Sequence, residues 1–312
     1  MSFDVTFPLV MLGAYGLCNL LLSGAVVLAW RTGLHRRLTD ADAVLGIRLL
    51  PALGSAALVL TIVLPAFLLY EPPHAHDRPG PLLVTSALFT LLVLGAGARR
   101  GWRAWRATRD LARVSQPHAT HPSAAGADVT VLDIEEPLVG VIGGWRQRIV
   151  AAQCVAAACD HEEFHQVLAH EAAHMDARDN LKLLMLLMTP DALAWLPAGS
   201  ALTEHWRAAA ELEADERASG CDPRKRVALA SALIKVARLS LARGRPRRAA
   251  RPGPALSGVE HRVRRLLAPA PAMHRGFPGR RVLTCALLVP LLAVPLYASV
   301  HRLIEALVAF GR

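Results

Sequence analysis

Three long apolar runs without a charged residue lie in the first hundred residues, and they constrain the fold of this chain more than any other feature. The runs are Pro8–Trp30, Leu49–Tyr70 and Pro81–Ala98. A helix of about 20 apolar residues is long enough to cross the hydrocarbon core of a bilayer. Each run is therefore predicted to be a membrane-spanning helix.

A fourth uncharged run, Val282–Val300, follows a long polar stretch and is predicted to be the last span. The composition agrees, because 53% of the residues are hydrophobic and the mean hydropathy is +0.33, whereas soluble domains are usually about 45–50% apolar. Only Asp4 carries a side-chain charge before the first run. Cleaved signal peptides begin with positive charge and have shorter apolar cores, so we expect the first span to remain in the mature protein.

The positive charges indicate how the spans are oriented. The chain has a formal net charge of +10, and its arginines cluster beside the apolar runs, at Arg31–Arg37, Arg99–Arg106 and Arg280–Arg281. Lys and Arg accumulate on the cytoplasmic side of membrane proteins. The stretch from Arg99 to Arg281 is therefore expected in the cytoplasm, with both termini outside. Since anionic lipids account for the basic clusters, we expect no nucleic-acid partner.

These patterns predict an α-helical multi-span membrane protein with an inserted domain. The expected division is 1–98 for three spans, 99–281 for a cytoplasmic domain, and 282–312 for the fourth span and a short outer tail. Within the inserted domain, Val129–Asp133 and Arg146–Ala152 have the composition of short strands. A helical pattern follows them, so the domain is predicted to be mainly α with a small β-sheet.

Two further segments of the inserted domain bear on the membrane. Leu181–Leu202 is apolar but is interrupted by Thr189, Pro190 and Asp191, so we predict that it does not span the bilayer. Val259–Leu267 is a basic amphipathic stretch. We interpret it as a lipid-facing tether that leads into the fourth span.

One segment has the H-E-x-x-H spacing of zinc peptidases, namely His170-Glu171-Ala172-Ala173-His174. Two histidines four residues apart lie on one face of a helix, so both rings can bind one zinc ion. The adjacent glutamate can then act as general base on the water bound to that ion. The spacing therefore predicts His170 and His174 as metal ligands and Glu171 as the catalytic residue.

A second H-E-x-x-H match, His161–His165, lies nine residues upstream. Nine residues at about 100° each turn a helix through half a circle, so the two matches face opposite directions and cannot share a site. Asp160 can cap this helix and Glu163 can complete a capping box with it, which explains the acidic residues without a metal ion. Small and apolar residues surround the downstream match, as suits buried ligands, and we prefer it as the site.

A catalytic zinc ion of this kind needs a third protein ligand and one open position. The third histidine of the metzincins is absent, because Ala177 and Asn180 stand where their glycine and histidine would be. A sequence E-L-E-A-D lies downstream on a helical segment, from Glu211 to Asp215. Glu211 is predicted as the third ligand, and Asp215, one turn later, as a hydrogen-bond acceptor for a ligand imidazole.

These motifs resemble those of the BlaR/MecR-type membrane metallopeptidases, a bacterial gluzincin family. The resemblance rests on Val167–Asn180, the E-L-E-A-D sequence, a strand-turn-strand at Pro137–Ala151, and three spans before the motif with one after it. It implies a zincin-like fold for the inserted domain and zinc bound by His170, His174 and Glu211. It also implies regulatory proteolysis at the cytoplasmic face of the bacterial inner membrane, directed at a transcriptional repressor or at the protein itself.

The resemblance also implies Glu171 as general base and Asp215 as the residue that orients a ligand. The best-known members of the family continue after the fourth span into a penicillin-binding sensor domain, whereas this chain ends at Arg312. We therefore do not expect direct β-lactam sensing, and a separate sensor protein could supply the signal.

The motif does not indicate which group stabilises the oxyanion. The three tyrosines lie in or beside the predicted spans, at Tyr15, Tyr70 and Tyr297. Arg178, eight residues after His170, and His205 are left as candidate donors.

Two other functions remain open from the sequence. One is a housekeeping membrane protease similar to the HtpX and CAAX proteases, in which the spans are arranged more evenly around the site. The other is a signal transducer whose zinc ion is structural and has no open position. All three interpretations expect zinc and a lipid bilayer, and both protease interpretations expect a protein or peptide substrate.

Overall fold

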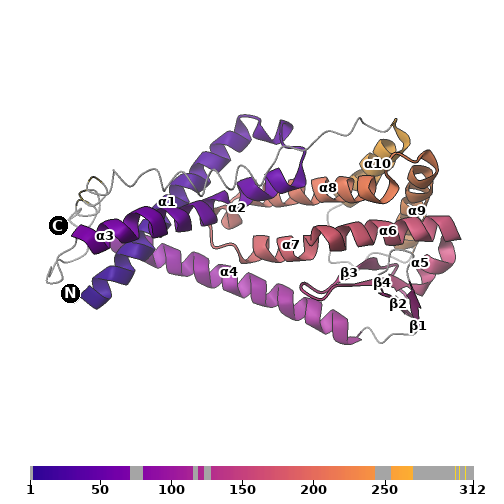
Figure 1. Cartoon of the computed structure of the whole chain (residues 1–312), viewed down its shortest axis with the longest axis horizontal. Helices are drawn as coiled ribbons and strands as arrows, with labels where there is room; N and C mark the ends of the chain where they lie inside the picture. The colour runs from indigo at the N-terminus through magenta and orange to yellow at the C-terminus, as the bar shows by residue number, and fades with distance from the viewer. Residues whose placement is uncertain are drawn as a thin grey trace. The chain divides into compact units, whose positions relative to one another are not determined.

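The structure is a computed structural model that describes residues 3–70, 80–114, 119–122, 128–242 and 254–269, together with Ser299, Arg302 and Ala306. The predicted fourth span, Val282–Val300, lies outside these residues apart from Ser299. The described chain is mostly helical and carries one small sheet (Figure 1). It divides into two compact units.

The first unit includes Met1–Trp102 and Met185–Trp206. Its long helices are α1 (Phe3–Arg31), α2 (Ala41–Leu58) and the greater part of α4 (Pro81–Val114). The segments Thr6–Arg31, Ala41–Tyr70 and Pro81–Ala107 are long and apolar enough to cross a membrane. The three spans predicted before the inserted domain are therefore confirmed as candidate spans, which indicates a multi-pass membrane protein.

Helix α2 continues through the π-helical segment η2 (Val59–Val63) into α3 (Leu64–Tyr70). Pro65 has no backbone N–H to donate to the residue four positions earlier, so the regular α-helical ladder is interrupted where η2 lies. Phe67 of α3 is buried together with Val10 of α1 and Leu83 of α4. This apolar cluster holds the three long helices together.

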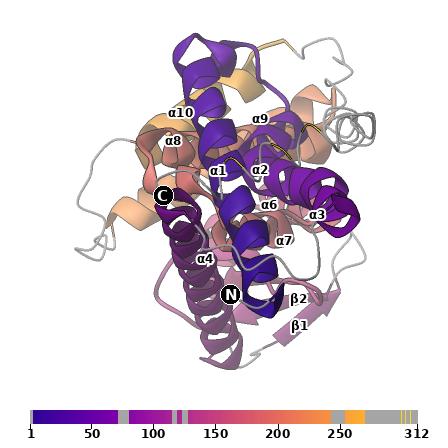
Figure 2. The ribbon, with the colours of Figure 1, turned by 90° about the vertical axis from the view of Figure 1, so that its left-hand side faces the viewer.

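Glycine allows α1 and α4 to approach closely. A Cβ atom at Gly16 would lie 2.5 Å from the carbonyl oxygen of Ser86 and 2.6 Å from Oγ1 of Thr90, closer than side chains tolerate. Thr90 also donates a hydrogen bond of 2.7 Å to the carbonyl oxygen of Leu12. Helix α1 meets the first turns of α4 at the left of Figure 1, and Figure 2 shows the two helices beside one another.

Polar side chains of the long helices bind the segment Met185–Trp206, which includes the short helix η3 (Ala192–Trp195). The buried carboxylate of Asp191 accepts a hydrogen bond of 2.5 Å from Arg48 of α2. Further bonds run from Tyr15 and Arg100 to backbone carbonyls of the segment, namely those of Pro190, Leu187 and Thr189. The sequence predicts this segment in the inserted domain, and these long-range bonds, which no local pattern reveals, explain the difference.

The second unit includes Arg103–Leu184 and Arg207–Arg275. Its strands are β1 (Ala119–Pro122), β2 (Asp128–Leu132), β3 (Val139–Ile142) and β4 (Arg148–Ala152), arranged in the order β1-β2-β4-β3. The central pair β2 and β4 is parallel, and the two outer pairs are antiparallel. The strands predicted at Val129–Asp133 and Arg146–Ala152 are confirmed as β2 and β4. The composition did not reveal β1.

Several helices follow the sheet, namely α5 (Gln153–Ala158), α6 (His161–Ala177), α7 (Asp179–Met188), α8 (Pro197–Ser219), α9 (Pro223–Ala242) and α10 (Pro254–Leu267). Helix α6 covers one face of the sheet (Figure 1), where its residue Leu168 is buried with Val129 of β2 and Ile149 of β4. The turn between β3 and β4 requires a glycine, because Gly143 has φ 97° and a Cβ there would collide with the carbonyl oxygen of Arg146. The sheet thus positions α6 through its apolar face.

Helix α10 packs inside the second unit. Its residue Leu266 is 3% exposed and is buried with Leu229 and Ala230 of α9. Arg226 of α9 donates hydrogen bonds to the last backbone carbonyls of α10, at 2.6 Å to Arg265 and 2.9 Å to Leu266. The interpretation of Val259–Leu267 as a lipid-facing tether is therefore wrong for Leu266, which packs on protein, whereas Leu267 is exposed. An amphipathic pattern shows that a helix needs an apolar partner, but not whether the partner is lipid or protein.

Candidate metal centre

Helix α6 begins as the sequence predicts. Asp160 is its N-cap and accepts a hydrogen bond of 2.8 Å from the backbone N–H of Glu163. The Glu163 carboxylate in turn accepts a bond of 2.8 Å from the backbone N–H of Asp160, which completes the capping box. The acidic residues of the upstream H-E-x-x-H match are thus used to start the helix, and the cap leaves the downstream match in the middle of it.

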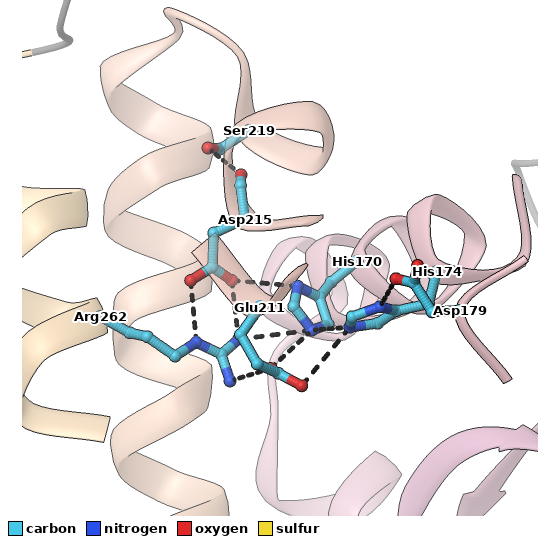
Figure 3. A network of polar contacts seen from close by, with 7 residues as sticks. All are labelled: His170, His174, Asp179, Glu211, Asp215, Ser219 and Arg262. Atoms are coloured by element: carbon cyan, nitrogen blue, oxygen red, sulfur yellow. Dashed lines mark hydrogen bonds and ion pairs between the residues drawn. The ribbon is translucent and has the colours of Figure 1, made fainter. Parts of the chain in front are cut away.

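The structure brings His170, His174 and Glu211 together. One ligand atom from each residue lies within 4.8 Å of the others. The two Nε2 atoms are 3.1 Å apart, Nε2 of His170 is 3.5 Å from Oε2 of Glu211, and Nε2 of His174 is 3.6 Å from Oε1. Figure 3 shows both rings, from α6, directed toward the Glu211 carboxylate of α8.

These separations fit a tetrahedral zinc ion. Zinc binds imidazole nitrogen and carboxylate oxygen at about 2.0–2.2 Å, so ligand atoms around a tetrahedral ion are about 3.3–3.6 Å apart. The separations among the three residues match this requirement to within a few tenths of an ångström. Among the described residues the group offers three ligand atoms, one fewer than a four-coordinate zinc ion takes.

Each histidine also contacts a second carboxylate through its other ring nitrogen. Nδ1 of His170 lies 3.0 Å from Oδ1 of Asp215, the aspartate one turn after Glu211. Nδ1 of His174 donates to Oδ2 of Asp179 at 2.7 Å. A carboxylate on Nδ1 keeps the proton there and leaves the lone pair of Nε2 for a metal ion. Asp179 has this position although the H-E-x-x-H pattern does not indicate it.

The backbone at the end of α6 explains how Asp179 reaches His174. Arg178 has φ 55° and ψ 40°, a left-handed conformation that ends the helix. This break separates α6 from α7, and Asp179, the first residue of α7, lies beside His174 in the last turn of α6. The next residue, Asn180, donates hydrogen bonds of 2.8 and 3.1 Å to the carbonyl oxygens of Val141 and Gly143, which fastens this corner to β3.

Helix α10 contributes a residue that sequence reasoning missed. Arg262 donates to Oδ2 and Oδ1 of Asp215 at 2.8 and 2.7 Å, and to Oε2 of Glu211 at 2.6 Å. Its Nη2 also lies 3.3 Å from Nε2 of His170 (Figure 3). The sequence shows that Arg262 is charged but not where it lies. Its partners are 47 to 92 residues earlier in the sequence, and only the packing of α10 brings Arg262 to them.

The cluster perturbs its own ionisable groups. Burial opposes ionisation of Glu211, but the hydrogen bond from His170 and the charge of Arg262 lower the pKa of Glu211 to about 2. Burial alone would lower the pKa of His170, whereas the carboxylates of Asp215 and Glu211 raise it to about 9. Burial raises the pKa of Glu171 above its ordinary value, against the opposing effect of the two histidines. Glu211 is therefore ionised at neutral pH, as a metal ligand must be.

The two residues considered as oxyanion donors occupy other places. Arg178 is exposed and serves as the C-cap of α6. His205 belongs to the first unit, where its Nε2 donates to the carbonyl oxygen of Leu38 at 2.7 Å and its ring packs edge-on against Trp30. The described contacts thus bring neither side chain together with the three ligands.

Comparisons with protein-family models, with curated proteins and with solved structures gave no match to this chain.

Proposed function

We propose that this protein is a membrane-embedded zinc-dependent endopeptidase. The observation that carries the proposal is the convergence of His170, His174 and Glu211 at separations suited to one tetrahedral zinc ion. Glu171 stands beside His170 in the position of the general base of H-E-x-x-H peptidases. The proposal includes a zincin-like fold for the second unit, a fourth span at Val282–Val300 and an active site at the cytoplasmic face.

The residues around the site have roles that follow from their contacts. A zinc ion bound there would lower the pKa of a bound water to about 7 and polarise the scissile carbonyl. Glu171 would take the proton from that water and deliver it to the leaving amine, and its raised pKa suits this task near neutral pH. Asp215 and Asp179 would hold the two imidazoles in the orientation that the metal requires.

A peptide substrate could pair with the sheet. Strand β3 stands at the end of the order β1-β2-β4-β3, so its outer edge has no strand partner among the described residues. Asn180 occupies the carbonyl oxygens of Val141 and Gly143, which leaves the Val139 end of this edge for an added strand. Main-chain pairing of this kind binds extended peptides with little regard for sequence. The proposed substrate is therefore an extended protein segment, in a regulatory cleavage of a repressor or of the protein itself.

The test uses the purified full-length protein in detergent, loaded with zinc. The change Glu171→Gln should leave the zinc content at one ion per chain and reduce cleavage of a fluorescently labelled unfolded protein by at least about 100-fold. Glu162→Gln is the matched control, because Glu162 holds the same position in the upstream H-E-x-x-H match and lies on an exposed part of α6. This control should cleave like the wild type.

Chelation should abolish cleavage by the wild type, and added zinc should restore it. Proteolysis that persists in Glu171→Gln would refute the assignment of the base. A zinc-containing protein without any cleavage of itself or of the unfolded substrate would favour the interpretation as a signal transducer with a structural zinc ion.

A further inference from the structure

Helix α10 holds Arg262 in a fixed position. The last turn of α10 is fastened to α9 by Arg226, which binds the carbonyl oxygens of Arg265 and Leu266. Arg265 also forms an ion pair of 2.5 Å with Glu216 of α8. These contacts connect α10 to both α8 and α9. The position of Arg262 in the cluster is therefore set by the packing of its helix.

The guanidinium of Arg262 contacts the same atoms that a metal ion needs. Nη1 lies 2.6 Å from Oε2 of Glu211, and Nη2 lies 3.3 Å from Nε2 of His170. Both atoms belong to the proposed ligand residues, and Nε2 of His170 offers only one lone pair. A metal ion and Arg262 would therefore compete for Nε2 of His170 and Oε2 of Glu211.

The contacts with Asp215 do not compete in this way. Arg262 forms two hydrogen bonds with the Asp215 carboxylate, at 2.7 and 2.8 Å, and Asp215 is not one of the three ligands. The Asp215 side chain is 4% exposed, whereas that of Glu211 is 40% exposed. The two bonds of Arg262 to Asp215 can therefore persist after its bonds to Glu211 and His170 are released.

We propose that Arg262 is a built-in competitor for the metal site, which neutralises the carboxylates of Glu211 and Asp215 when no metal is bound and weakens metal binding because its bonds must be released. This inference rests on the proposed metal site. A charge-assisted hydrogen bond must break and a cation must remain close to the metal, and both effects oppose binding. Without Arg262, the carboxylates of Glu211 and Asp215 would lose a cation that contacts both of them.

The experiment measures zinc affinity directly, by competition with a fluorescent chelator, in the full-length protein freed of metal. Arg262→Met preserves the length of the side chain without its charge, and it should bind zinc about tenfold or more tightly than the wild type. Arg262→Lys keeps the charge but cannot bridge two carboxylates as a guanidinium does, and it should have an intermediate affinity. Arg264→Met is the control, because Arg264 is 79% exposed and pairs with Glu260 on the same helix.

A second readout is thermal unfolding with and without zinc. Arg262→Met should lower the melting temperature of the metal-free protein and should show a larger increase on zinc addition than the wild type. If the Arg262→Met variant does not fold, the zinc affinities of the Arg262→Lys variant and the wild type are compared instead. Tighter zinc binding by the Arg262→Lys variant supports the inference. Equal or weaker zinc binding by the folded variants would overturn it, and would show that Arg262 only orients Glu211. Failure of the wild type to bind zinc at all would overturn the proposed function as well.

Discussion

The hydrogen bond between His174 and Asp179 gives the sharpest test of the site geometry. Nδ1 of His174 donates to the Asp179 carboxylate at 2.7 Å, and the two side chains are only 15% and 13% exposed. A hydrogen bond to a charged group contributes about 1.5–3 kcal/mol, and its neutral counterpart contributes about half as much. Asp179→Asn keeps an oxygen acceptor but loses the charge, at a cost of about 1 kcal/mol, so zinc should bind about fivefold more weakly.

Asp179→Ala removes the acceptor and should weaken zinc binding by about 10–100-fold, because the imidazole is then free to rotate and to change its tautomer. The assay is chelator competition with the purified full-length protein. Asp176→Asn is the control, since Asp176 is an exposed aspartate on α6, the helix of His174, two residues from the ligand. If a folded Asp179→Ala variant bound zinc as tightly as the wild type, the orientation of the His174 ring would not depend on a carboxylate. The role given to Asp179 would then be wrong.

Two predictions concern stability. Burial by itself would raise the pKa of Glu163, but hydrogen bonds from Lys235, Ser231 and the Asp160 backbone lower it. Ionised Glu163 therefore stabilises the fold at pH values above its unfolded-state pKa of about 4.3. This stabilisation is lost as the pH falls through the lower pKa of the folded state. Glu163→Gln should destabilise the protein by about 1–3 kcal/mol at pH 7, and in thermal melts the difference from the wild type should shrink toward pH 3; a constant difference would contradict this. In the first unit, Asp191→Asn should cost about 3–5 kcal/mol because it leaves the buried Arg48 unpaired. The double change Arg48→Met with Asp191→Leu should melt closer to the wild type than Asp191→Asn does, and a melting temperature as low as that of Asp191→Asn would refute this account.

Local sequence patterns were sufficient for the parts of the fold that depend on neighbouring residues. The three apolar runs could be recognised from length and charge alone, and the start of α6 from the spacing of Asp160 and Glu163. The convergence of Glu211 with the two histidines could be expected because a zinc site needs a third ligand, although the supporting segment is 37 residues away. By contrast, β1 is a short strand whose residues, Ala119–Pro122, carry no strand pattern of their own.

The residues that the sequence did not reveal depend on backbone turns and on distant packing. Asp179 is five residues after His174. If α6 continued through it, the two residues would lie on different faces of the helix, because only residues three or four apart share a face. It reaches the ring only because Arg178 adopts a left-handed conformation and ends the helix. Arg262 stands among other arginines that local charge cannot distinguish from it, and only the packing of α10 on α9 selects it.

The short distance between His170 and Glu211 bears on the polypeptide that connects them. The two side chains are 3.5 Å apart, and a single bilayer crossing between them would place them on opposite sides of a membrane. Met185–Trp206, which lies between His170 and Glu211 in the sequence, groups with the apolar helices of the first unit, whereas both ligands belong to the second unit. Arg100 and Tyr15 donate hydrogen bonds to backbone carbonyls of Met185–Trp206. Non-helical backbone near lipid is tolerated only where protein groups satisfy it. These bonds therefore satisfy backbone carbonyls of a segment for which the sequence predicts an element that does not span the bilayer.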